Sequence, residues 1–214
     1  MKKILFLCLC FPLLLQAQIK GDYTWLLGYD AGWVTPDDDI GEGIILDFNQ
    51  NPTRFEYFPK EDLAPFYWTS AMISDEEGEL QFYSNGCRVM NANHQIMENG
   101  NGINPGFVHD DQCVNIGRGY PVAQGAIVIP KPNNEKVYYM LHQKLEVLYD
   151  TPGFPVAVDG LYYTTIDMNL NNGLGGVVEK NIAAFSDTLD YSLLTVTKHD
   201  NNICLLYTSP SPRD

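Results

Sequence analysis

Residues 69–84, with the sequence TSAMISDEEGELQFYS, decide the fold class. Apolar and polar side chains alternate on both sides of Asp75-Glu76-Glu77-Gly78, which is the pattern of two antiparallel strands joined by a turn. Gly78 supplies the positive φ angle that a tight hairpin turn requires. The stretch therefore predicts a β-hairpin, with strands over residues 69–74 and 79–84.

The same theme begins three times along the chain. SAMISD at residues 70–75 is followed by GAIVIP at 125–130 and LTVTKH at 194–199, so the starts lie 55 to 70 residues apart. Further strands are expected over residues 22–28, 43–48, 87–91, 137–143, 161–168 and 176–183, and no segment has a sustained helical period with caps. Repeats of about four strands are typical of propeller blades. We therefore expect an all-β fold, an incomplete β-propeller of about two or three four-stranded antiparallel blades.

The first seventeen residues have the layout of a secretory signal peptide. Lys2 and Lys3 precede an apolar run over residues 4–15, and Ala17 offers a small residue for cleavage. The run is shorter than the ~20 apolar residues that a helix needs to cross a bilayer. We expect export to the cell exterior or the outer-membrane surface, with no transmembrane segment in the mature chain.

The last residues, 204–214, read CLLYTSPSPRD and resemble a translated sequencing adapter. An apolar run breaks into Ser-Pro-Ser-Pro, which cannot continue a strand. Two interpretations are open, a foreign tail or a genuine proline-rich one. We expect the foreign tail, so that residues 18–203 are the partial propeller domain of a longer protein.

Charge and cysteine content limit the partners. The chain has 27 acidic and 13 basic residues, a net charge of −14, which disfavours nucleic acid as a partner. Of the five cysteines, Cys87 and Cys113 lie outside the signal peptide and the tail. In an exported protein these two can form a disulfide, or they can remain as two buried or unpaired thiols. No spacing of cysteines or histidines suggests structural zinc.

Several short motifs follow one another in a fixed order. They are SDEEGELQFYSNG (74–86), MENG (97–100), QGAIVIPKP (124–132), VYY (137–139), YTTIDM (163–168), GLGGVVEKN (173–181) and KH (198–199). Together, over about residues 22–203, they resemble the N-terminal propeller region of secreted proteins from gliding, type IX-secreting Bacteroidetes bacteria. The resemblance implies a WD-repeat-like or YVTN-like propeller in a longer protein that the type IX secretion machinery exports. It implies no catalytic residues.

Candidate binding residues lie in or beside two loops, residues 35–39 and 99–124, which we expect at the rim of the propeller. The candidates are Trp33, Asp37, Asp38, Asp39, Asp110 and Asp111. Their carboxylates are also possible calcium ligands, but they lack the spacing of an EF-hand loop, and solvated turns explain them better. We therefore expect no metal and no cofactor, with calcium as the one alternative. Trp25, Tyr67 and Trp68 are expected to pack between sheets or to stack on a sugar.

These features favour an exported or cell-surface module that binds protein or glycan at the propeller rim. One alternative is a secreted hydrolase with two facing carboxylates, for which Asp159 and Asp167 are examples. The other is a structural or adhesive module. The four histidines show no metal-binding spacing and are expected on the surface or in strand packing.

Overall fold

The computed structural model describes residues 20–28, 43–58, 64–149, 155–187, 193–198 and 204–208, with side chains described up to residue 196. Within these ranges the chain forms thirteen strands, one short helical segment and a 3-10 turn, so the prediction of an all-β protein is confirmed. No helix in this part of the chain is long and apolar enough to span a membrane. The predicted signal peptide, Trp33, Asp37, Asp38 and Asp39 lie outside the described residues.

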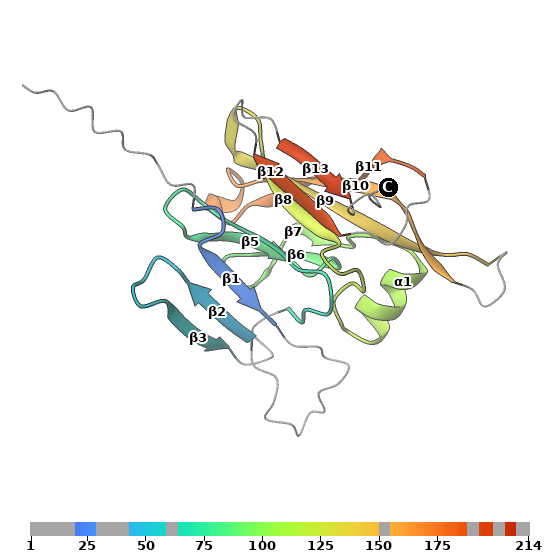
Figure 1. Cartoon of the computed structure of the whole chain (residues 1–214), viewed down its shortest axis with the longest axis horizontal. Helices are drawn as coiled ribbons and strands as arrows, with labels where there is room; N and C mark the ends of the chain where they lie inside the picture. Colours follow the sequence, from blue (N-terminus) through green and yellow to red (C-terminus); the bar gives the residue numbers. More distant parts are fainter. Residues whose placement is uncertain are drawn as a thin grey trace, which may run out of the picture.

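The N-terminal sheet has three antiparallel strands in the order β1 (Thr24–Leu27), β2 (Gly43–Asp47) and β3 (Arg54–Phe58). In β1, Thr24 and Leu26 are buried, whereas Trp25 and Leu27 are exposed. This alternation follows from the two-residue period of a strand. The sheet therefore buries one face against the rest of the molecule (Figure 1).

Eight strands form two antiparallel meanders. The first meander is β4 (Ala71–Ser74), β5 (Leu80–Ser84), β6 (Arg88–Asn91) and β7 (Ile96–Asn101), and the second is β8 (Ala126–Lys131), β9 (Asn134–Val147), β10 (Val156–Asp167) and β11 (Gly176–Phe185). They join through a parallel bridge between β7 and β11, where Glu98 lies opposite Gly176, and β4 also contacts β8. The eight-stranded sheet is therefore nearly closed.

The main core lies between the two meanders. It is formed by buried side chains from both, and they are Ala71, Phe82, Val89, Met97, Ile103, Ala126, Val128, Tyr138, Met140, Ile166, Met168 and Val177. The opposite face of the first meander carries Tyr83 and Met90, which pack with Leu26 and Phe66 in a second core. Because neighbouring residues point to opposite faces, β4, β5 and β6 each supply both cores, whereas β7 supplies only the main core, through Met97. The result is a stack of the N-terminal sheet, the first meander and the second meander.

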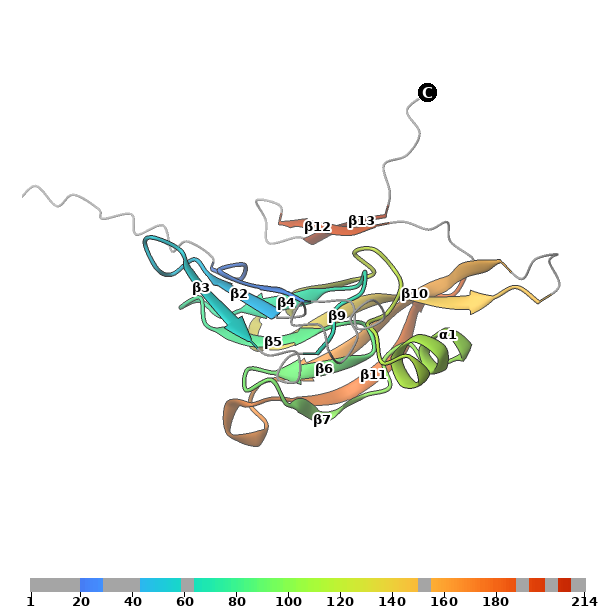
Figure 2. The same ribbon diagram turned by 90° about the horizontal axis from the view of Figure 1, so that it is seen from below.

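The first strands of successive units lie side by side. β1 contacts β4, β4 contacts β8, and β8 contacts β12 (Leu194–Lys198). The Leu194 N–H donates to the Gln124 carbonyl at 3.2 Å. β12 pairs with β13 (Cys204–Thr208), and Figure 2 shows this hairpin at one edge of the molecule, with β7 at the opposite edge. A strand at 204–208 does not bear on the origin of the tail, because a Leu-Leu-Tyr run favours a strand from any source.

Each of the predicted strands is present, but β3, β7 and the helical segment were not predicted. β7 contains Asn99-Gly100, which resembles a turn, yet Gly100 is a buried residue of the strand. The backbone of β6 approaches it so closely that a Cβ on residue 100 would lie 2.7 Å from the Val89 carbonyl oxygen. The helical segment is α1 (Phe107–His109) continued by a π-helical turn, η1 (Asp110–Asn115). It is too short for a recognisable period and has no side-chain cap.

The predicted hairpin at residues 69–84 is confirmed, with β4 paired to β5. Asp75 Oδ1 accepts hydrogen bonds from the N–H groups of Glu77 and Glu79, at 3.1 and 2.9 Å. Gly78 has a φ of 91°, and its carbonyl accepts from Thr24 Oγ1 and Asn49 Nδ2. The turn thus ties the first meander to the N-terminal sheet.

Replacement of Gly78 by alanine is expected to lower the free energy of unfolding by about 2 kcal/mol or more, because φ is positive and the new Cβ meets the Asn49 side chain. Gly102→Ala is the matched control, since Gly102 has a φ of 72° but nothing within 4 Å of the added Cβ. Urea unfolding of both variants measures the difference. Equal losses would contradict the contact between the turn and the N-terminal sheet.

Candidate functional site

Two loops at one end of the strands form a continuous surface, which we call the rim and define as residues 64–70 and 102–124. The first loop leads into β4 and the second into β8. The Thr69 N–H donates to the Tyr120 carbonyl at 3.1 Å, and Thr69 Oγ1 donates to the Val122 carbonyl at 2.7 Å. A Cβ on Gly119 would lie 2.7 Å from the Tyr67 backbone nitrogen, so the two loops pack backbone against backbone.

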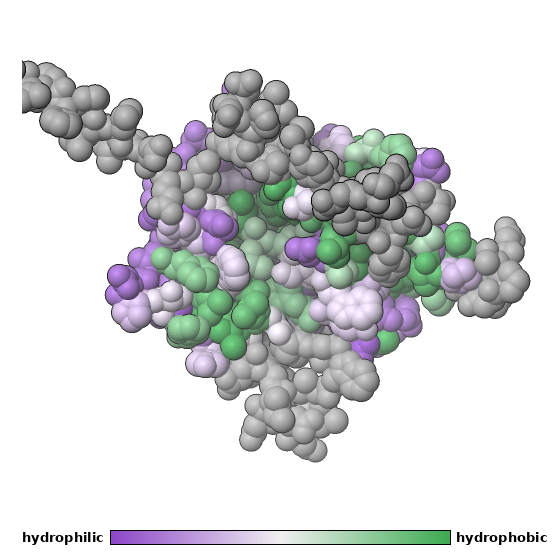
Figure 3. All heavy atoms as spheres, viewed as in Figure 1, coloured by the Kyte–Doolittle hydropathy of each residue, from purple (hydrophilic) through white to green (hydrophobic). Residues whose placement is uncertain are grey.

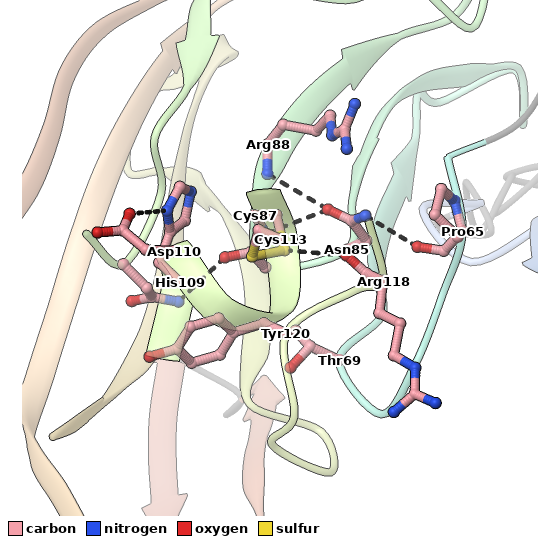
Figure 4. The surroundings of a disulfide bond; sticks show 12 residues. Pro65, Thr69, Asn85, Cys87, Arg88, His109, Asp110, Cys113, Arg118 and Tyr120 are labelled. Carbon is pink, nitrogen blue, oxygen red and sulfur yellow. Dashed lines mark hydrogen bonds and ion pairs between the residues drawn. A yellow bond between two sulfur atoms is a disulfide. The ribbon is translucent and has the colours of Figure 1, made fainter. Parts of the chain in front are cut away.

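Asn85 holds the rim to the first meander (Figure 4). This fully buried side chain donates from Nδ2 to the Pro65 carbonyl at 2.8 Å, and Oδ1 accepts from the N–H groups of Cys87 and Arg88. Its own carbonyl accepts from the Tyr120 N–H at 2.8 Å. Since a buried amide is stable only when its donors and acceptors are satisfied, this network fixes the loop positions.

Cys87 and Cys113 form a disulfide in the structure, with their Cα atoms 5.7 Å apart. The bond attaches the helical segment to the start of β6, as Figure 4 shows. Beneath it lies a third core, formed by Val108, Tyr120, Val122, Leu145 and Val158 with the two cysteines. The longest loop of the described chain is therefore held by a covalent bond and a core of its own.

Asp110 and Asp111 lie side by side on η1 but bind different neighbours. Asp110 Oδ1 is 3.3 Å from His109 Nδ1, and Asp111 Oδ2 accepts from Gln112 Nε2 at 2.6 Å. The described residues contain no group of three or more His, Cys, Asp or Glu side chains that could hold a metal ion. The two aspartates that the sequence nominated therefore lie on the rim without converging on a common centre.

The aromatic residues of the rim form an exposed platform. Tyr67 and Trp68 stack with ring centroids 4.8 Å apart, and the Arg118 guanidinium lies 4.9 Å from the Tyr67 centroid. Trp68 is 54% exposed. The sequence nominated Tyr67 and Trp68 for packing or stacking but not Arg118, because no local pattern connects Tyr67 with a residue so far along the chain. The rim also exposes apolar side chains on and beside the helical segment, namely Phe107, Val114 and Ile116.

A groove of about 330 Å³ runs along β1, β4, β8 and β12. Its polar walls include Asp22, Ser70 and Gln124, and its floor includes Ala71 and Val128. Figure 3 shows hydrophobic side chains in the hollow at the middle of this face. Trp25 lies at the groove and packs edge-on against Phe48, with ring centroids 5.3 Å apart.

The two carboxylates considered for hydrolysis do not face each other. Asp159 and Asp167 both belong to β10, eight residues apart, which corresponds to about 25 Å along an extended strand. Carboxylate pairs of glycosidases are separated by about 5–9.5 Å. Asp167 accepts from the Asn169 N–H in the turn after β10. These two residues therefore do not form a glycosidase pair.

Asp159 belongs instead to a charged cluster on β9 and β10. It accepts from Lys144 Nζ at 2.8 Å and from Tyr162 Oη at 3.4 Å, and Glu146 lies 3.1 Å from Lys144 Nζ. Burial lowers the pKa of Lys144, but its hydrogen bonds to the two carboxylates outweigh that effect and raise it overall. Lys144 is therefore a fixed cation that bridges neighbouring strands, and the cluster does not line the groove along β1, β4, β8 and β12.

His142 connects the rim to the second meander. It is fully buried, with Nδ1 2.6 Å from Asn104 Oδ1 and Nε2 3.0 Å from Thr164 Oγ1. Asn104 Nδ2 in turn donates to the Gly86 carbonyl at 3.2 Å. Burial lowers the pKa of His142 to about 3, so the ring is neutral. As expected from its strand position, this histidine serves packing, and it adds a polar link between distant segments.

No protein-family model matches this chain, and no curated protein or solved structure is significantly similar to it.

His142 is expected to make stability depend on pH. Between its ordinary pKa of 6.5 and about 3, the unfolded chain takes up a proton that the folded chain excludes. The free energy of unfolding therefore falls as the pH is lowered through this window, by up to about 1.4 kcal/mol per pH unit for this one proton. Measured by urea unfolding between pH 4 and pH 7, the free energy of unfolding should change less steeply with pH for His142→Gln than for the wild type. An unchanged slope would contradict the buried neutral ring.

Proposed function

We propose that the chain is part of an exported β-propeller that binds protein or glycan at the rim. The layered meanders support the propeller, because blades are four-stranded antiparallel sheets whose first strands line a central channel. Here β1, β4, β8 and β12 lie side by side along one groove. The N-terminal sheet and the two meanders would be two to three blades, and β12 the first strand of the next.

The free face of the second meander is consistent with a further blade. A shallow cavity of about 290 Å³ lies on this face, and its lining includes Ile129, Tyr139, Leu141 and Tyr163. The corresponding face of the first meander, which carries Phe82 and Val89, is covered by the second meander. In a complete propeller the next sheet would cover these side chains, which fits a domain that belongs to a longer protein.

Export is supported by the disulfide between Cys87 and Cys113, because such bonds persist in oxidising compartments and are rare in the cytosol. The predicted signal peptide agrees with this location. The type IX route and a surface location in a Bacteroidetes cell rest on the resemblance of the sequence motifs.

The observation that carries the binding proposal is Trp68, which is exposed and stacked on Tyr67 although its loop is fixed by buried hydrogen bonds. Aromatic platforms bind sugar rings and apolar side chains, and a fixed platform loses little entropy on binding. Arg118 adds a cation beside the platform. The hydrolase alternative has less support because Asp159 and Asp167 lie far apart on one strand.

A glycan and peptide array tests this proposal. The wild-type chain is expected to bind a defined subset of probes, and Trp68→Ala is expected to weaken that binding at least about tenfold, the usual effect of removing a central aromatic contact. Trp25→Ala is the matched control, since Trp25 is an exposed tryptophan at the groove. A class preference in the array separates glycan from protein as the ligand.

The disulfide provides a second arm of the same experiment. Cys87→Ser with Cys113→Ser releases the helical segment from β6 and is expected to weaken binding, because the rim loses its fixed geometry. No bound probe in either array, or equal losses for Trp68→Ala and Trp25→Ala, would contradict binding at the rim.

A further inference from the structure

The outer face of the N-terminal sheet is apolar across all three of its strands. The register of the sheet places two rows of facing side chains on this side, away from the first meander. The rows are Trp25, Leu46 and Phe55, and Leu27, Ile44 and Tyr57. Hydrophobic side chains gather over these strands in the view of Figure 3. We call these six residues the N-terminal face.

The N-terminal face is exposed. Phe55 and Tyr57 are 62% and 64% exposed, and Trp25 and Leu27 are about half exposed. An aromatic side chain has about 150–250 Å² of surface, so these four residues present roughly 400 Å² of contiguous apolar surface. Soluble monomers rarely expose larger apolar patches, and a patch of this size marks an interaction site. We therefore expect another sheet to cover this face.

The second meander has a free face at the opposite end of the stack of layers. Because the first meander lies between the N-terminal sheet and the second meander, the two outer faces point away from each other. The free face of the second meander is hollowed by the cavity of about 290 Å³. At its centre the rings of Tyr139 and Tyr163 meet edge-on, with centroids 5.8 Å apart, and Leu141 lies opposite Tyr163. We call its apolar lining, Ile129, Tyr139, Leu141 and Tyr163, the cavity face.

The two faces match in chemistry and differ in shape. Side chains stand roughly perpendicular to a sheet, so the exposed rings of Phe55 and Tyr57 project from the N-terminal face. The cavity face is concave and has aromatic walls. A projecting apolar patch and an apolar hollow on different surfaces of one molecule favour a head-to-tail contact between copies. Two N-terminal faces packed against each other would leave the hollow unfilled, and its lining would lose dispersion contacts.

The charges around the two faces are compatible with contact between copies. The cavity has one exposed lysine and one exposed glutamate in its wall, Lys131 and Glu179. Strand β3 likewise carries one exposed charge of each sign, in the ion pair of 2.9 Å between Arg54 and Glu56. The net charge of −14 is therefore not concentrated where two copies would meet. Repulsion between acidic chains does not oppose this contact locally.

We propose that copies of this chain associate head-to-tail, with the N-terminal face of one copy packed on the cavity face of the next. The exposed rings of β3 enter the hollow beside Tyr139 and Tyr163. The contact repeats the sheet-on-sheet packing that joins the layers within one chain, and the second copy takes the place of a further blade. Burial of both faces removes on the order of 1,000 Å² from water, the lower end of specific protein–protein interfaces. The rim lies at the strand ends, outside both faces, so binding at the rim is tested separately.

Sedimentation velocity of the whole chain over a range of concentrations tests this contact. The wild type is expected to form complexes of two or more copies. Phe55→Lys with Tyr57→Lys changes the N-terminal face, and Leu141→Lys with Tyr163→Lys changes the cavity face. Each pair is expected to weaken association at least about tenfold, the usual effect of removing central aromatic contacts.

The matched control is Phe107→Lys with Val114→Lys. Both residues are exposed apolar side chains of the helical segment on the rim, outside the two faces. The control makes the same change in net charge as each face variant, and its association is expected to equal that of the wild type.

Mixing the two face variants distinguishes a head-to-tail contact from pairing of like faces. Each variant retains the face that the other has lost, so a head-to-tail contact predicts a complex with one copy of each variant. Circular dichroism verifies that each variant keeps its strands. Alanine at the same four positions repeats the test with a smaller risk to folding.

A mixed complex supports the proposal. A wild type that stays monomeric overturns it and assigns the two faces to other partners. Loss of association in the N-terminal variant alone identifies pairing of two N-terminal faces and overturns it as well. Equal weakening in the rim control, which indicates nonspecific aggregation, or a mixture of folded face variants that stays monomeric, has the same consequence.

Discussion

The structure depends on the face-to-face packing of the two meanders. The Phe82 ring from β5 meets the Tyr138 ring from β9 edge-on, with centroids 5.4 Å apart, and both residues are buried. Neither meander has another way to bury this face, and a sheet with one exposed apolar face is not stable in water. Since residues 82 and 83 point to opposite sides, the same strand also supports the N-terminal sheet. Two cores that share the strand β5 thus set the positions of all three layers.

This packing separates the chemistry of the molecule into two ends. Strands that alternate in direction bring the loops before β4 and β8 to one end and the turns after them to the other. The rim end carries the disulfide, the buried Asn85 and the exposed Trp68. The opposite end carries the turn from Asp75 to Gly78, which contacts the N-terminal sheet through Thr24 and Asn49. The His142 network joins the rim to β10 through Asn104 and Thr164, so the rim is continuous with the core of the second meander.

Local patterns predicted the hairpins well and the long-range contacts poorly. The turn at Asp75 and Gly78 was evident because side-chain capping and a positive φ are properties of four adjacent residues. β7 was missed because Asn99-Gly100 has turn chemistry, although here the glycine allows close approach to β6. Cys87 and Cys113 were nominated without a decision on pairing, since spacing gives no distance between them. Arg118 joins Tyr67 only through the fold, and no property of either residue indicates this in the sequence.

The most direct test of the packing of the two meanders is a double-mutant cycle between Phe82 and Tyr138, with each replaced by leucine and the free energy of unfolding measured by urea for both single variants and the double variant. Edge-on packing across the core predicts a coupling energy of about 0.5–1.5 kcal/mol. A coupling of zero within error would contradict the face-to-face arrangement on which the position of the rim depends.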